Sequence, residues 1–327
     1  MRAPKPTLLT AAKMVGTAAL IAAIAWTVGV IQPDGSIGES QADILDVSFL
    51  KLSNSAKVAH ALQQLGHDEP QSLNINGNVV HFSVNHEKKR PDQLMREYQE
   101  EFVRQGLNTR VWDNHNTRGN TDEMILEGMT GGVIPIESTP EHVALGGVVT
   151  ANDAEDDEQL LEMAKDSTPA NEVFKGHQFI EMYWDRSKRA STVTATWSDE
   201  KFDYGKMLAG ADSQQKDIDV DPLVPACPGC TRLSRVRDLD PSREYSSNSY
   251  ASTRAQREMV GFYRDAMTKR GWEETDSSLV LDTIRPNVRH VGDEATLMQF
   301  SKGARFLTVM AYPDKDGRTT VHTVMSD

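Results

Sequence analysis

The sequence predicts an α+β protein, in which an N-terminal transmembrane helix precedes two related two-layer modules, each a helix packed on an antiparallel sheet. Three observations support this prediction. An uncharged apolar run near the N-terminus is close to the length that spans a bilayer. Two helix-like segments share one pattern, and strand-like segments follow each of them. A helix with one apolar face must cover the apolar face of a sheet, which gives two layers.

The apolar run is MVGTAALIAAIAWTVGVI, residues 14–31, and Arg2, Lys5 and Lys13 precede it. Basic residues mark the cytoplasmic flank of a membrane segment. We therefore expect residues 1–13 in the cytoplasm, a single-pass anchor in the inner membrane, and a body exported to the periplasm or outside. The alternative is a cleaved signal peptide and a secreted body. No A-x-A cleavage pattern follows the run, which favours the anchor.

A juxtamembrane helix is predicted over residues 40–66. Leu45, Phe49 and Leu52 recur at helical spacing, and Gly66 is suited to ending the helix. We expect its apolar stripe to pack on its own domain. A coiled-coil homodimer is the alternative, although the stripe is shorter than the three to four heptads typical of such dimers.

The first module is predicted to span residues 70–203. The Asn76-Gly77 pair is a strong signal for a tight hairpin, with strand-like sequence after it. A helix then follows, because Pro91 suits the first turn and Gly106 suits the position just past the end.

The second module, residues 226–327, repeats this pattern after a linker at 204–225. Four residues recur at identical spacing in the two helices: Leu94, Tyr98, Phe102 and Gly106 correspond to Met259, Tyr263, Met267 and Gly271. Thr253 and Gln256 predict a capping box for the second helix. Residues 179–184 resemble 306–311, and residues 191–199 resemble 319–327. Two matches in the same order predict an internal duplication.

An acidic insertion distinguishes the first module, near residues 150–175. The segment NDAEDDEQLLEMAKD, residues 152–166, has seven acidic residues and one lysine. Such a run most often solvates a surface helix. The alternative is a docking element for another envelope protein. Its candidate residues are Glu155, Asp156, Asp157, Glu158 and Glu162.

The only cysteines, Cys227 and Cys230, lie in the sequence P-A-C-P-G-C-T. A c-type haem needs C-x-x-C-H, but Thr231 takes the histidine position. A zinc site would need two more ligands, which the spacing of the histidines does not supply. A Pro-Gly centre favours a type II turn whose ends lie close enough for a disulfide. We predict a disulfide clasp, with a thiol-disulfide redox pair as the alternative.

The net charge of −13 argues against a nucleic-acid partner. The sequence contains no phosphate-binding or dinucleotide glycine motif, no G-x-S-x-G and no metal-ligand spacing. No cofactor and no metal are therefore expected, and the protein is more consistent with a non-enzyme. The predicted function is a membrane-anchored extracytoplasmic binding or scaffold protein of a bacterial envelope assembly. The alternative is an exported thiol-disulfide or thiol-sensing protein.

Overall fold

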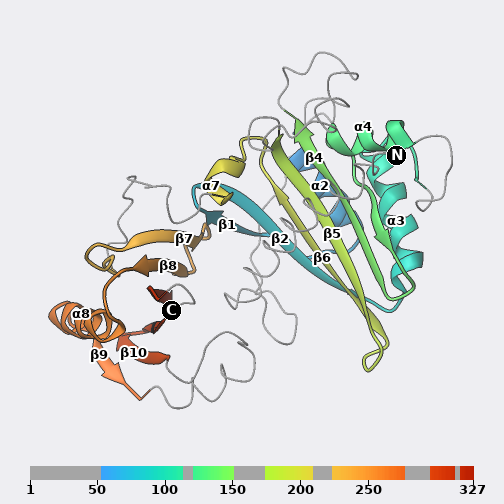
Figure 1. Ribbon diagram of the computed structural model, residues 1–327. Coiled ribbons are helices and arrows are strands. Elements are labelled where there is room, and N and C mark those ends of the chain that lie inside the picture. Colours follow the sequence, from blue (N-terminus) through green and yellow to red (C-terminus); the bar gives the residue numbers. More distant parts are fainter. Residues whose placement is uncertain (1–52, 113–120, 151–173, 209–222, 277–294, 314–316) are drawn as a thin grey trace, which may run out of the picture. The chain divides into compact units, whose positions relative to one another are not determined.

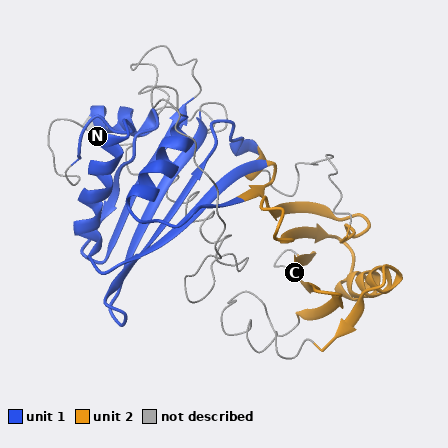
Figure 2. Cartoon of the chain, turned by 180° about the vertical axis from the view of Figure 1, so that it is seen from behind, with its two compact units in different colours: residues 1–72, 78–205 blue, residues 73–77, 206–327 orange. Residues whose placement is uncertain are grey.

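The computed structural model describes residues 53–112, 121–150, 174–208, 223–276, 295–313 and 317–327 (Figure 1). These residues form two compact units (Figure 2). Unit 1 takes its residues from 1–72 and 78–205, and unit 2 from 73–77 and 206–327. The predicted membrane segment 14–31 lies outside the described residues, as does the predicted helix up to residue 52. None of the helices in the described ranges is both long and apolar enough to cross a bilayer.

The predicted α+β class is wrong. The described residues are mainly antiparallel β, with 45% in strands and 25% in helices. The described ranges contain twelve strands. Runs of β-branched and aromatic residues, the signal used to predict strands from the sequence, mark only those strands whose side chains are apolar. This signal misses strands such as Ser246–Ser252, in which four of seven residues are serine.

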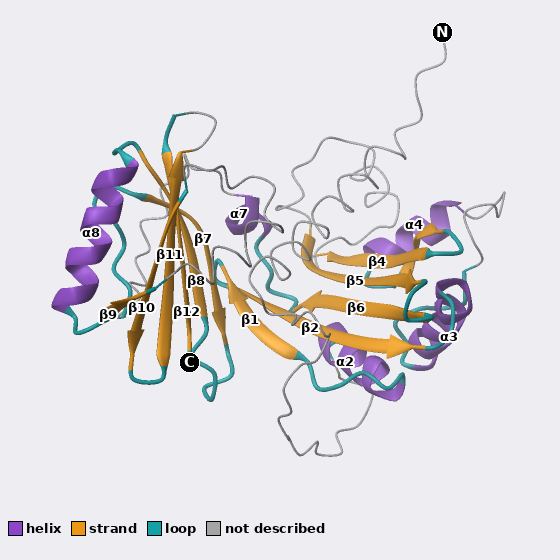
Figure 3. Ribbon diagram, turned by 90° about the horizontal axis from the view of Figure 1, so that it is seen from below, coloured by secondary structure: helices purple, strands orange, loops and turns teal. Residues whose placement is uncertain are grey.

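Unit 1 is a five-stranded antiparallel sheet against which three helices pack (Figure 3). Its helices and strands, in chain order, are α2 (Asn54–Gln64), β2 (Asn78–Glu87), α3 (Pro91–Arg104), α4 (Thr121–Met129), β3 (Ile134–Ser138), β4 (His142–Thr150), β5 (Phe174–Asp185) and β6 (Ala190–Ser198). The short helix α7 (Tyr204–Leu208) begins in unit 1 and ends in unit 2. The strand order is β3-β4-β5-β6-β2. Helices α2 and α3 bury their apolar faces against Ile180, Ala195 and Trp197 of the sheet.

Unit 2 has a longer sheet and one covering helix. It contains β7 (Thr231–Asp238), β8 (Ser246–Ser252), α8 (Gln256–Lys269), β9 (Glu273–Thr275), β10 (Thr296–Lys302), β11 (Arg305–Pro313) and β12 (Thr319–Ser326), together with most of β1 (Gln71–Ile75). The order is β1-β7-β8-β12-β11-β10-β9. Helix α8 packs Met259, Tyr263 and Met267 into a core with sheet residues such as Phe300 and Leu307.

The two units share a strand order. In unit 1 a strand and a helix (β2, α3) precede the meander β4-β5-β6, whose last strand pairs with β2; in unit 2 β8, α8 and β10-β11-β12 repeat this arrangement. Cross-strand pairing defines the equivalent residues. Phe82 pairs with Thr196, and Ser247 pairs with Val324. Phe82 is therefore equivalent to Ser247. The difference in residue number is the same as that between Tyr98 and Tyr263, so the correspondence found for the helices also holds for these strands.

Pairing also corrects the equivalence predicted for the next strand. Ile180 pairs with Ala195, and Val309 pairs with Thr323. Because Ala195 and Thr323 hold equivalent positions in β6 and β12, Ile180 is equivalent to Val309. The sequence match made Ile180 equivalent to Leu307, and this prediction is therefore wrong by two positions. A slip of two keeps every side chain on its correct face, because strands have a period of two.

At the ends of the equivalent helices, the structure confirms one sequence prediction and contradicts another. Gly106 and Gly271 follow α3 and α8 with φ of 65° and 76°, so the predicted glycine ends are confirmed. The predicted capping box of Thr253 and Gln256 is wrong, because the N-cap residue of α8 is Ala255 and no side chain caps it. Gln256 instead donates to the carbonyl oxygen of Ala311 at 2.9 Å, which ties α8 to the sheet.

The equivalent tyrosines of the two helices are held differently. The Tyr98 hydroxyl lies 2.7 Å from Nε2 of His67, and Nδ1 of His67 lies 2.9 Å from the Ser83 hydroxyl. In unit 2 the Tyr263 hydroxyl faces the backbone of Cys227. Burial raises the pKa of both tyrosines. A histidine network in unit 1 therefore takes the place that the cysteine turn has in unit 2.

This difference gives a matched pair of substitutions. Tyr98→Phe should lower the free energy of unfolding of unit 1 by about 1 kcal/mol, because it leaves the buried His67 ring without one partner. Tyr263→Phe should cost unit 2 less, because no side chain bonds its hydroxyl in the described residues. Native-state hydrogen exchange of the α3 and α8 amides measures each unit separately. Equal losses in the two variants would contradict the histidine network as a stabilising contact.

Candidate functional site: a groove beside strand β7

The two cysteines lie immediately before β7 and form a clasp. Their Cα atoms are 5.4 Å apart and the predicted disulfide is confirmed. Gly229 has φ of 70°, and the amide of Cys230 donates to the carbonyl of Cys227 at 3.1 Å, as a tight turn requires. Cys227 is only 3% exposed and belongs to the unit 2 core. The sulfur of Cys230 lies 3.8 Å from that of Met259 on α8, so the clasp packs on this helix.

The acidic residues proposed for docking, Glu155, Asp156, Asp157, Glu158 and Glu162, lie outside the described residues. Their role therefore stays a prediction. Within the described ranges, no three His, Cys, Asp or Glu side chains gather so that they could hold a metal ion.

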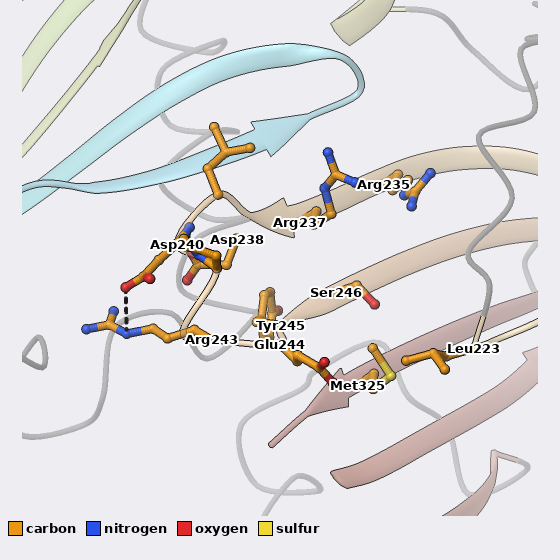
Figure 4. Close-up of a pocket in the computed structure, with 12 residues that line it drawn as sticks. Leu223, Arg235, Arg237, Asp238, Asp240, Arg243, Glu244, Tyr245, Ser246 and Met325 are labelled. Atoms are coloured by element: carbon orange, nitrogen blue, oxygen red, sulfur yellow. Dashed lines mark hydrogen bonds and ion pairs between the residues drawn. The ribbon is translucent and has the colours of Figure 1, made fainter.

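A groove of about 350 Å³ lies in unit 2, where the connection from β7 to β8 passes the end of β12 (Figure 4). Its lining combines an apolar wall with arginines and carboxylates. The lining residues are Leu223, Arg235, Arg237, Asp238, Leu239, Asp240, Pro241, Arg243, Glu244, Tyr245, Ser246 and Met325. A volume of this size is at the lower end of the range for ligand sites, about 300–1,000 Å³.

Strand register places two arginines on the groove side of β7. Arg235 pairs with Asn248 and Arg237 with Ser246, so the two side chains share one face (Figure 4). Arg235 is buried at 8% exposure, whereas Arg237 is exposed. Arg237 makes no ion pair with any residue that the structure describes. The R-x-R spacing is the sequence signal for this arrangement, although in the sequence alone these arginines indicate only positive charge near the cysteines.

The carboxylates of the β7–β8 connection are engaged locally. Asp240 accepts hydrogen bonds from the Ser242 amide at 2.9 Å and hydroxyl at 2.7 Å. These bonds, with the charge of Arg243 at 3.7 Å, lower the pKa of Asp240. Asp238 accepts from the amide of Asp240 at 2.9 Å.

The remaining carboxylate, Glu244, forms a forked ion pair with Arg305, with one contact at 2.6 Å. This pair raises the pKa of Arg305. The acids around the groove thus have partners within the loop or on β11. Arg237 is the exposed arginine of the lining, and it makes no ion pair with a described residue.

The groove also presents neutral polar groups. Its lining contains hydroxyls from Tyr245 and Ser246 but no histidine, cysteine or lysine. Burial raises the pKa of Tyr245, which keeps its hydroxyl neutral at ordinary pH. Protein-family models, curated proteins and solved structures gave no match to this chain. The geometry of the groove is therefore the basis on which a function can be inferred.

A second polar cluster lies on β3, β4 and β5 of unit 1. The His142 ring stacks on Tyr183 with centroids 4.3 Å apart, and Tyr183 is 48% exposed. His142 contacts Glu137 at 3.1 Å and Glu181 at 3.3 Å, while the Tyr183 hydroxyl donates to Glu181 at 2.6 Å. These groups engage one another, so the cluster is a weaker candidate for binding than the groove.

Proposed function

We propose that this protein is a non-catalytic, extracytoplasmic binding and scaffold protein of a bacterial envelope assembly, and that the groove beside β7 is its binding site. The observation that carries the proposal is the combination, in one cavity of about 350 Å³, of an apolar wall and the guanidinium of Arg237, which has no ion pair among the described residues. Apolar surface with a few directed polar groups is typical of recognition sites.

Export of the body is supported by two features. Arg2, Lys5 and Lys13 precede the uncharged run of residues 14–31, which is the charge pattern of a segment that directs export. The disulfide is the second feature, because structural disulfides form and persist in oxidising compartments.

The alternative of a thiol-disulfide exchange protein is less well supported. Exchange requires a thiol to reach one of the sulfurs, and a reactive cysteine is partly exposed in an electropositive setting. Cys227 is buried in the unit 2 core, and Cys230 is partly exposed but packs against Met259 of α8. A clasp that fixes the start of β7 agrees better with this burial.

In-cell crosslinking of the tagged full chain, followed by mass spectrometry, tests the binding function. We expect a stoichiometric envelope partner. Leu239→Asp, which places a charge on the apolar wall, should reduce its recovery about tenfold. Phe306→Asp is the matched control, because Phe306 is also an exposed large apolar residue of unit 2 but does not line the groove.

Thiol trapping in intact cells tests export independently. An exported chain should show no cysteine that alkylates before reduction. Free thiols in the freshly trapped protein would contradict export, and the absence of any crosslinked partner would contradict the binding function.

A further inference from the structure

We propose that the groove beside β7 recognises an acidic peptide segment of a partner protein, with a carboxylate of the peptide on Arg237 and a neighbouring apolar side chain on the wall formed by Leu239, Pro241 and Met325. This inference rests on the proposed binding function and specifies its ligand.

The charge of the groove supports a carboxylate ligand. Asp238 accepts from the amide of Asp240, Asp240 is bonded to Ser242 and Arg243, and Glu244 is paired with Arg305. Each of these three acids therefore contacts a group other than Arg237. Arg237 is exposed on the strand and has no ion pair in the described part of the chain. A guanidinium presents a planar fork of donors that matches a carboxylate in a two-bond contact.

The shape of the groove supports a peptide with apolar character. Leu239 is 36% exposed, one of three large apolar side chains that remain exposed among the described residues. It stands two residues from Arg237 along the chain and lines the same groove. The volume of about 350 Å³ accommodates a short stretch of side chains.

Fluorescence anisotropy with two labelled peptides tests the inference on the full chain. One peptide alternates glutamate and leucine, and the other alternates glutamine and leucine. We expect the glutamate peptide to bind at least tenfold more tightly, with affinity that falls as salt is raised. Arg237→Gln should abolish this preference, and Arg237→Lys should restore part of it because the charge returns without the fork.

Arg257→Gln is the control variant, since Arg257 is an exposed arginine of α8 outside the groove. It should leave the preference unchanged. Equal binding of the two peptides, or a preference that survives Arg237→Gln, would overturn the inference. A different outcome separates the two proposals. If Leu239→Asp abolishes the recovery of a partner from cells and Arg237→Gln does not, the binding function is retained and the acidic ligand is rejected.

Discussion

Acidification from pH 7 to pH 4 is expected to lower the free energy of unfolding of unit 1 by several kcal/mol. Burial lowers the pKa of His67 to about 4, and burial together with the charge of His81 lowers that of His177 to about 4. Both groups are therefore neutral in the folded chain and regain the ordinary value of 6.5 on unfolding. Between pH 6.5 and pH 4 the unfolded chain binds more protons than the folded chain. The free energy of unfolding therefore decreases as the pH is lowered through this range. Each histidine contributes about 3 kcal/mol to this loss.

The two histidines are expected to respond differently to substitution. His177 has neither ring nitrogen bonded and lies edge to face with Phe202, with centroids 4.9 Å apart. His177→Phe should therefore leave the fold intact and remove its share of the acid sensitivity. His67 bonds both Tyr98 and Ser83, so His67→Phe should also destabilise unit 1 at neutral pH.

Urea unfolding of wild type and of His177→Phe at pH 7, 5.5 and 4 measures these effects. Hydrogen exchange of α3 and α8 assigns the loss to a unit. Burial also lowers the pKa of His322 in unit 2, so α8 should lose some protection as well. An unchanged pH dependence in His177→Phe would contradict the assignment of that proton to His177.

The sequence predicts those parts of the fold that short segments determine. Helices α3 and α8 follow from apolar residues at helical spacing, and their ends follow from Gly106 and Gly271, whose positive φ favours glycine. The disulfide follows from the short spacing around Pro228-Gly229. In each case the residues that cause the structure are neighbours in the chain.

The mainly antiparallel class could not be predicted, because strand pairing joins distant residues. Strand β8 is rich in serine, and the chain passes through α8, β9, β10 and β11 before it reaches the partner strand β12, so neither local pattern nor proximity identifies the pair. The same reason explains why the sequence match placed Ile180 opposite Leu307 instead of Val309. Only pairing with β6 and β12 sets that register.

The groove could not be predicted from the sequence for a related reason. Its lining runs from Leu223 to Met325, and only the fold brings these two residues together. The R-x-R spacing of Arg235 and Arg237 was visible, but its meaning depends on register with Asn248 and Ser246.

Removal of the clasp is the second large expected effect. The double substitution Cys227→Ala with Cys230→Ala should lower the free energy of unfolding of unit 2 by about 2 kcal/mol, the loop-closure contribution for a four-residue loop. The loss should be concentrated at β7, which begins at Thr231 directly after the clasp, and at α8, on which Cys230 packs. Hydrogen exchange of β7 and α8, with α3 as the internal reference, measures it.

The clasp also links stability to the groove, because β7 carries both Arg235 and Arg237. A turn that holds the first residue of the strand restricts its fraying, and preorganised strands bind ligands with a smaller entropic cost. The double alanine variant should therefore bind the glutamate-leucine peptide more weakly, while it keeps the preference for glutamate over glutamine. Wild-type stability in the double variant would show that packing of the turn alone holds β7 in place.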